Sequence, residues 1–144
     1  MSSRRDVTDK MKQFAKQARN GAYFVKRGFI NWAEFDFETN KRAISILVDE
    51  EGLFPDKRGM ENARISMEIF TSISKSTEPV MIDDGVMDEL IEDARWIVNQ
   101  LEQAKNKQGE NVALKIDKHA SNLVESHDAT LGVQGIVAII RVTY

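Results

Sequence analysis

A single stripe of apolar residues in the second half of the chain constrains the fold most. From Asp84 to Lys105, apolar side chains recur every three or four residues, which is the spacing of one helix face. The stripe consists of Met87, Leu90, Ile91, Ala94, Ile97, Val98, Leu101 and Ala104. Asp83 or Asp84 is suited to cap the N-terminus, and Gly109 can end the helix. A helix with one apolar face must pack that face against a sheet or another helix.

The N-terminal region predicts a second amphipathic helix, from about residue 4 to residue 19. Its apolar positions are Val7, Met11, Phe14, Ala15 and Ala18, again at helical spacing. The pair Asn20-Gly21 follows and predicts the C-terminal end, because glycine tolerates the left-handed conformation of a helix cap.

Alternation of apolar and polar residues predicts the strands. Residues 33–37 carry apolar side chains on one side, and residues 43–48 form the returning strand of a hairpin. The acidic side of the first strand is formed by Glu34, Asp36 and Glu38. Further strands are expected at residues 65–69, 112–116, 121–127 and 132–144. The last of them is apolar on both faces for part of its length, which is typical of a central or covered strand.

The predicted order is α-β-β-β-α-β-β-β, which indicates an α+β protein with an antiparallel sheet flanked by two main amphipathic helices. The 144 residues fit a single domain, residues 1–144. The longest apolar run, residues 136–140, is far shorter than the roughly 18 residues of a membrane span. The first ten residues contain no apolar segment of the kind found in signal peptides.

Motifs that carry chemistry are scarce. The chain has no cysteine, which excludes disulfides, thiolate metal sites and a cysteine nucleophile. It contains no G-x-S-x-G elbow, no P-loop and no G-x-G-x-x-G. The segment Gly132–Gly135 is a G-x-x-G that precedes a strand, so we expect it to relieve a bend or bulge. We therefore expect neither enzymatic activity nor a bound cofactor or metal.

Two alternatives remain open. A metal-dependent hydrolase would use the only histidines, with Asp117 and His119 on one strand and Glu125 and His127 on an adjacent strand. A small nucleic-acid-binding module would use the basic N-terminal segment, because residues 1–30 hold eight Lys or Arg against two Asp or Glu. The rest of the chain holds twelve against twenty-one. The same basic residues could also form the solvated face of one helix.

Self-association fits the remaining features better. The connection Asp49–Asn62 carries apolar residues within a charged segment, which resembles the composition of an interface. Aromatic residues are concentrated in residues 23–32. The candidate interface residues are Trp32, Leu53, Phe54, Asp56, Lys57, Arg58 and Met60. Because charge is segregated along the chain, a basic face and an acidic face could pair head to tail and close a ring.

The layout resembles the tail terminator (tail completion) proteins of long-tailed bacteriophages. The likeness begins with an N-terminal helix that runs into R-N-G-A-Y and continues with the long helix DELIEDARWIVNQLEQA. It ends with the closing strand G-I-V-A-I-I-R-V-T-Y. It implies that the long helix and the closing strand are scaffold and that Asp49–Asn62 is a contact loop.

Such proteins form a hexameric ring that caps the tail tube, stops its polymerisation and offers a docking surface to the head–tail connector. The resemblance therefore implies a virion protein, assembled in the host cytoplasm, whose partners are its own copies, the tail tube protein and the connector. In a contractile tail, the sheath terminator region would be a further partner. It implies no catalytic residues. If DNA passes through the ring, Glu34, Asp36 and Glu38 are candidates for an acidic lumen that repels phosphates.

Overall fold

The computed structural model describes residues 3–51, 59, 61–73, 83–128 and 132–144, and for residues 49–51 and 118–128 it describes the backbone alone. The elements are α1 (Arg4–Gln17), a short 3-10 turn η1 (Ala18–Gly21), β1 (Tyr23–Arg27), β2 (Arg42–Glu51), β3 (Asn62–Ser72), α2 (Asp84–Gln103), β4 (Lys115–Asp128) and β5 (Val133–Thr143). The protein is therefore α+β, as the patterns predict.

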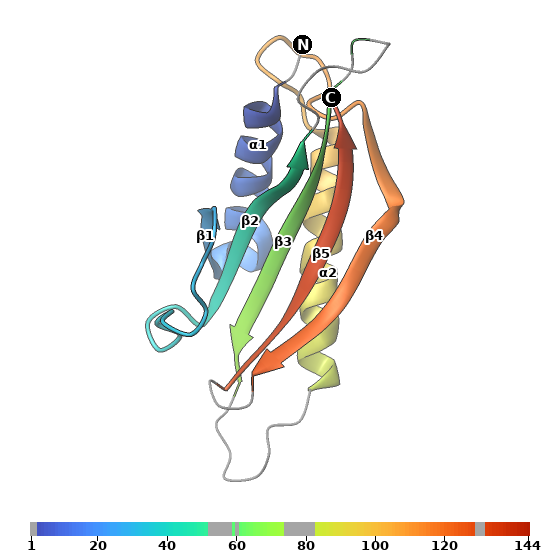
Figure 1. The fold of residues 1–144 in the computed structure, drawn as a ribbon. Coiled ribbons are helices and arrows are strands. Elements are labelled where there is room, and N and C mark those ends of the chain that lie inside the picture. Colours follow the sequence, from blue (N-terminus) through green and yellow to red (C-terminus); the bar gives the residue numbers. More distant parts are fainter. Residues whose placement is uncertain (1–2, 52–58, 60, 74–82, 129–131) are drawn as a thin grey trace.

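The five strands form one mixed sheet with the order β1-β2-β3-β5-β4, and α1 and α2 lie together behind one of its faces (Figure 1). Strand β1 pairs with β2 in parallel, and every other pairing is antiparallel. Strand β5, the closing segment of the sequence, lies between β3 and β4. Its position agrees with the prediction of a central strand.

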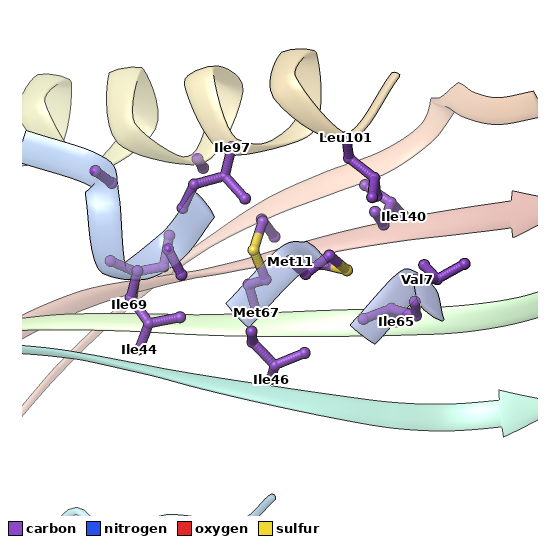
Figure 2. Packing of buried hydrophobic residues seen from close by; sticks show 14 of the residues in the cluster. Val7, Met11, Ile44, Ile46, Ile65, Met67, Ile69, Ile97, Leu101 and Ile140 are labelled. Atoms are coloured by element: carbon purple, nitrogen blue, oxygen red, sulfur yellow. The ribbon is translucent and has the colours of Figure 1, made fainter. Parts of the chain in front are cut away.

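The core lies between the two helices and this face of the sheet (Figure 2). Its largest fully buried side chains are Val7, Met11, Ile44, Ile65, Met67, Ile69, Leu90, Ile97, Leu101, Ile136 and Ile140. Burying each side chain of this size contributes roughly 1.5–3 kcal/mol. The apolar stripes that the sequence predicts form the buried faces of α1 and α2.

Both helices begin and end through local hydrogen bonds. Ser3 caps α1 in a capping box with Asp6, and the Asp83 carboxylate accepts hydrogen bonds from the amides of Gly85 and Val86 at the start of α2. After α1, three consecutive residues (19–21) adopt positive φ angles, so the predicted end at Asn20-Gly21 is confirmed. Helix α2 ends at Gln103, before the predicted glycine.

The predicted hairpin between residues 33–37 and 43–48 is wrong. Residues 32–34 and 37–39 form turns, and β2 instead pairs with β1 on one side and β3 on the other. The physical reason is that Phe35 and Phe37 pack with Trp32 in one cluster, which a regular strand could not achieve. The alternation of apolar and acidic residues in this segment therefore separates the aromatic side chains that pack together from the acidic side chains that are exposed.

Two further boundaries differ from the sequence prediction. The sequence predicts separate strands at residues 112–116 and 121–127, yet residues 115–128 form the single strand β4 with a register shift between Asp117 and Asn122. Such a bulge interrupts the alternation and so divides the pattern in two. Strand β2 also extends to Glu51, inside the predicted connection.

Candidate functional site

The face of the sheet opposite the helices is the first candidate. We call it the open face; on β2, β3 and β5 it consists of Ala43, Ser45, Leu47, Arg64, Ser66, Glu68, Phe70, Gly135, Val137, Ile139 and Arg141. No helix of the described chain covers it (Figure 1). Val137 and Ile139 lie near its centre and are only half-buried. A solvated sheet face normally carries polar residues at such positions, so this apolar centre is suited to contact a partner.

One end of the open face is covered by the aromatic connection, residues 28–41, which joins β1 to β2. The Trp32 ring stacks on the Phe70 ring of β3 with a centroid distance of 4.3 Å. Phe37 stacks against Trp32 at 6.0 Å, and Phe35 links Trp32 to Phe24 of β1. The indole N–H of Trp32 donates to the Glu68 carboxylate. These contacts fix the connection on the sheet.

Gly135 permits this arrangement. It pairs with Phe70 across β3 and β5, and a Cβ placed on it would lie 2.6 Å from Phe70 Cδ1 and 2.8 Å from the Ile69 carbonyl oxygen. The ladder between β3 and β5 shows no register shift at this point. The expectation that the G-x-x-G relieves a bend or bulge is therefore wrong for Gly135, which instead gives the Phe70 ring room on the sheet.

The acidic residues Glu34, Asp36 and Glu38 are exposed in the aromatic connection. They lie on turns, so they do not form the regular acidic strand face that the sequence predicts. The Asp36 carboxylate accepts hydrogen bonds from the Thr39 hydroxyl and from the amides of Thr39 and Glu38. The Thr39 hydroxyl and amide bonds lower the pKa of Asp36. A role of the three carboxylates in a lumen stays a prediction.

The predicted interface residues can be placed only in part. Leu53, Phe54, Asp56, Lys57, Arg58 and Met60 lie outside the described residues. Trp32 is half-buried, and its ring and N–H are engaged within the chain, as described above. Phe24 and Phe29 are 43% and 66% exposed. The sequence indicates both as aromatic residues interleaved with basic ones between Arg19 and Trp32, a pattern that belongs to the nucleic-acid alternative.

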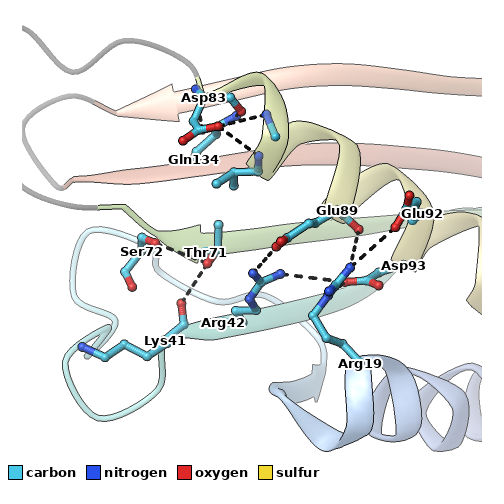
Figure 3. A network of polar contacts seen from close by, with 12 residues as sticks. Arg19, Lys41, Arg42, Thr71, Ser72, Asp83, Glu89, Glu92, Asp93 and Gln134 are labelled. Atoms are coloured by element: carbon cyan, nitrogen blue, oxygen red, sulfur yellow. Dashed lines mark hydrogen bonds and ion pairs between the residues drawn. The ribbon is translucent and has the colours of Figure 1, made fainter.

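A buried network of charges joins α2 to the N-terminal elements (Figure 3). The Asp93 side chain on α2 is 9% exposed and accepts hydrogen bonds from Arg19 Nε at 2.8 Å and from the Tyr23 hydroxyl at 2.5 Å. An Arg42 nitrogen lies 3.9 Å from the same carboxylate. Burial raises the pKa of Tyr23, and its hydrogen bond to Asp93 raises it further. The network thus holds α2 against β1 and β2.

The rim of this network is more exposed. Arg42 donates to the Glu89 carboxylate, and this hydrogen bond lowers the pKa of Glu89. Arg42 also lies over the Tyr23 ring, 5.9 Å from its centroid. Among the described residues, every buried side-chain nitrogen and oxygen has a hydrogen-bond partner. The cluster is therefore a satisfied structural network, in which each carboxylate is matched by a cation or donor.

The sequence contained a signal for this network. Asp93 lies on the buried side of α2, three residues after Leu90 and four before Ile97. An acidic residue on an apolar helix face requires a buried partner. Arg19, from the basic N-terminal segment, is that partner, so its positive charge is directed inward.

The alternative metal site is not formed as predicted. It requires Asp117 with His119 and Glu125 with His127 on neighbouring strands, but all four lie on the single strand β4. Because a strand rises about 3.3 Å per residue, the two histidine positions are on the order of 20–26 Å apart along it. Among the residues whose side chains are described, no group of three or more acidic or histidine residues could hold a metal ion.

Comparisons with known proteins add no relative: no protein-family profile matches the sequence, and no curated protein matches it significantly. Within the described chain, no helix is long and apolar enough to cross a membrane.

Proposed function

We propose that the chain is a structural virion protein of the tail-terminator type, which assembles into a hexameric ring on the end of the tail tube. The single observation that carries the proposal is the open face, where half-buried Val137 and Ile139 occupy the centre of the sheet. An apolar centre bordered by charged residues such as Arg64 and Arg141 is typical of a protein interface.

A contact between the open face and a different surface of the next copy is heterologous, and such contacts close rings when the rotation permits.

In this proposal the ring would stop polymerisation by covering the last layer of tube subunits with its lower surface. Its upper surface would receive the head–tail connector. The buried network around Asp93 and the core between helices and sheet would keep each subunit rigid during these contacts. A structural role is consistent with the hydrogen bonds made by every buried side-chain nitrogen and oxygen of the described residues.

The proposal is tested by measuring the mass of the assembly and by imaging it. Native mass spectrometry and negative-stain electron microscopy of the purified protein, alone and with tail tubes of its phage, should reveal closed rings at tube ends. The double variant Val137→Lys/Ile139→Lys should remain folded by circular dichroism and lose the rings, because charges in a desolvated interface are costly. The control Gln17→Lys/Asn99→Lys changes two exposed helix positions and should assemble normally. Rings that persist in the sheet variant would refute the role of the open face, and tubes without any cap would refute the terminator function.

A further inference from the structure

A strip of cations follows the edge of the molecule that α1 and β1 form. We call it the basic edge; its residues are Arg4, Arg5, Lys12, Lys16, Lys26 and Arg27. Arg5, Lys12 and Lys16 are spaced by seven and four residues, so they share one side of α1. The same side carries Thr8, whose hydroxyl accepts a hydrogen bond from Arg27 of β1. Two elements therefore direct their cations to the same edge.

The arginines of the basic edge border a hollow. A depression of about 480 Å³ is lined by Arg4, Arg5, Thr8, Arg27, Gly28, Ile46, Leu47 and Val48. Three arginines thus line a space large enough for a phosphate group, and one of them, Arg27, also pairs with Asp9 and Thr8. Guanidinium groups bind phosphate oxygens through paired N–H donors, which a lysine cannot reproduce.

Few described carboxylates oppose these charges. Asp6 is engaged by Ser3 in the capping box, so the helix N-terminus is already satisfied. Asp9 lies near both Arg5 and Arg27. Among the described side chains, Asp6 and Asp9 are the acidic residues of α1 and β1, against six cations on the basic edge, while the adjoining aromatic connection carries the exposed Glu34, Asp36 and Glu38. Such an excess is attractive to a polyanion.

Two exposed aromatic rings accompany the basic edge. Phe24 and Lys26 are two residues apart on β1, so they share the face of the strand on the side of the open face, opposite α1. Phe29 directly follows Gly28, which lines the hollow, and is the more exposed of the two rings. Cations that follow a backbone together with rings that stack on bases are the features of proteins that bind single-stranded nucleic acids.

We propose that the basic edge binds nucleic acid, with the arginine hollow holding a backbone phosphate and Phe24 and Phe29 stacking on unpaired bases. This binding does not depend on ring formation, because every residue involved belongs to one chain. β1 is the edge strand of the sheet, so its Arg27, on the side of α1, and its Lys26 and Phe24, on the side of the open face, lie along the same edge of the molecule.

Fluorescence anisotropy with a labelled 20-nucleotide DNA, single-stranded or duplex, tests the proposal between 50 and 300 mM salt. We expect binding at 50 mM that weakens steeply with salt, because phosphate neutralisation releases counterions. The variant Arg5→Glu/Lys12→Glu/Lys26→Glu should bind at least about tenfold more weakly, with a salt slope smaller by about 2.

The matched control is Lys41→Glu/Arg95→Glu/Lys107→Glu, which makes the same change in net charge at exposed positions outside the basic edge. It should lose clearly less affinity than the edge variant. Equal losses, or no binding by the unaltered protein at 50 mM salt, would overturn the proposal. So would a site that binds inorganic phosphate but no oligonucleotide. Circular dichroism confirms that each variant is folded.

The aromatic part is tested separately with Phe24→Ser/Phe29→Ser. This variant should lose about tenfold in affinity for single-stranded DNA and little for duplex. Equal losses for both forms would contradict base stacking. The Val137→Lys/Ile139→Lys variant should lose the rings and still bind DNA. Ring assembly and DNA binding are therefore tested by different variants, and either proposal can fail without the other.

Discussion

The buried amide of Gln134 holds the backbone of Asp83 with two hydrogen bonds, and so fixes the point at which α2 begins. Gln134 Oε1 accepts from the Asp83 amide at 3.1 Å, and Gln134 Nε2 donates to the Asp83 carbonyl oxygen at 3.0 Å (Figure 3). Gln134 is fully buried on β5. Asp83 in turn caps the helix with its carboxylate. A strand side chain therefore positions the helix cap.

Replacement of Gln134 by methionine should destabilise the protein by about 1–3 kcal/mol. The substitution keeps the length of the side chain but leaves the Asp83 amide and carbonyl without their partners. Chemical denaturation measures the change in the free energy of unfolding, and hydrogen exchange should accelerate at the first amides of α2. The matched control is Gln103→Met at the exposed end of the same helix, which we expect to change stability by less than about 0.5 kcal/mol. Equal effects of the two substitutions would contradict the proposed anchor.

Replacement of Gly135 by alanine should cost about 1–3 kcal/mol, since the new methyl group would overlap the Phe70 ring and the Ile69 carbonyl. Thermal unfolding is a sufficient measurement. The variant Phe70→Leu removes the ring, so the loss caused by Gly135→Ala should be smaller in that background. If the two effects simply add, the close approach of the ring is not the reason for the glycine.

Stability should fall as the pH rises above about 10, because the pKa of Tyr23 is raised in the folded protein. An acid with a raised folded-state pKa keeps its proton after the unfolded chain has lost it. The stabilisation that Tyr23 provides is therefore fully present below the pKa of the unfolded chain, near 10, and is lost as the pH rises toward the pKa of Tyr23 in the folded protein. The slope has a limit of about 1.4 kcal/mol per pH unit.

The comparison of the unaltered protein with Tyr23→Phe isolates this effect, because the other titrating groups are shared. The difference in unfolding free energy should be constant below pH 9 and shrink between pH 10 and 11.5. A difference that stays constant over the whole range would show that Tyr23 titrates as in the unfolded chain.

Much of the fold was predictable because the core uses simple periodicities. The stripe of α2 and its Asp83 cap follow from the sequence, since the positions of the stripe are buried in the core or packed against it and the cap is formed by local atoms. Strand β1 was not predictable in the same way. Tyr23–Arg27 has only five residues, and its exposed Phe24 obscures the alternation. Its parallel partner, β2, is separated from it by the aromatic connection.

The candidate surfaces were less predictable, because they depend on contacts between distant segments. Charge counts identified the basic N-terminal segment, but not that Arg19 is directed to Asp93 while Arg27 lies beside the hollow. The aromatic residues around Trp32 suggested an interface, whereas the Trp32 ring rests on Phe70, 38 residues further along the chain. Only the register between strands brings such residues together.

Tryptophan fluorescence should show whether Trp32 is an internal or an intermolecular residue. The variant Trp96→Phe leaves Trp32 as the only tryptophan, and its stacking on Phe70 predicts a blue-shifted emission that acrylamide quenches poorly. This emission should not change with protein concentration, because Trp32 makes these contacts within one chain. The reciprocal variant Trp32→Phe leaves Trp96, which is 38% exposed beside Phe14, and should emit at longer wavelength. If the Trp32 emission shifts to shorter wavelength only when the protein oligomerises, Trp32 belongs to the subunit interface after all, and the aromatic connection is completed by a neighbouring copy.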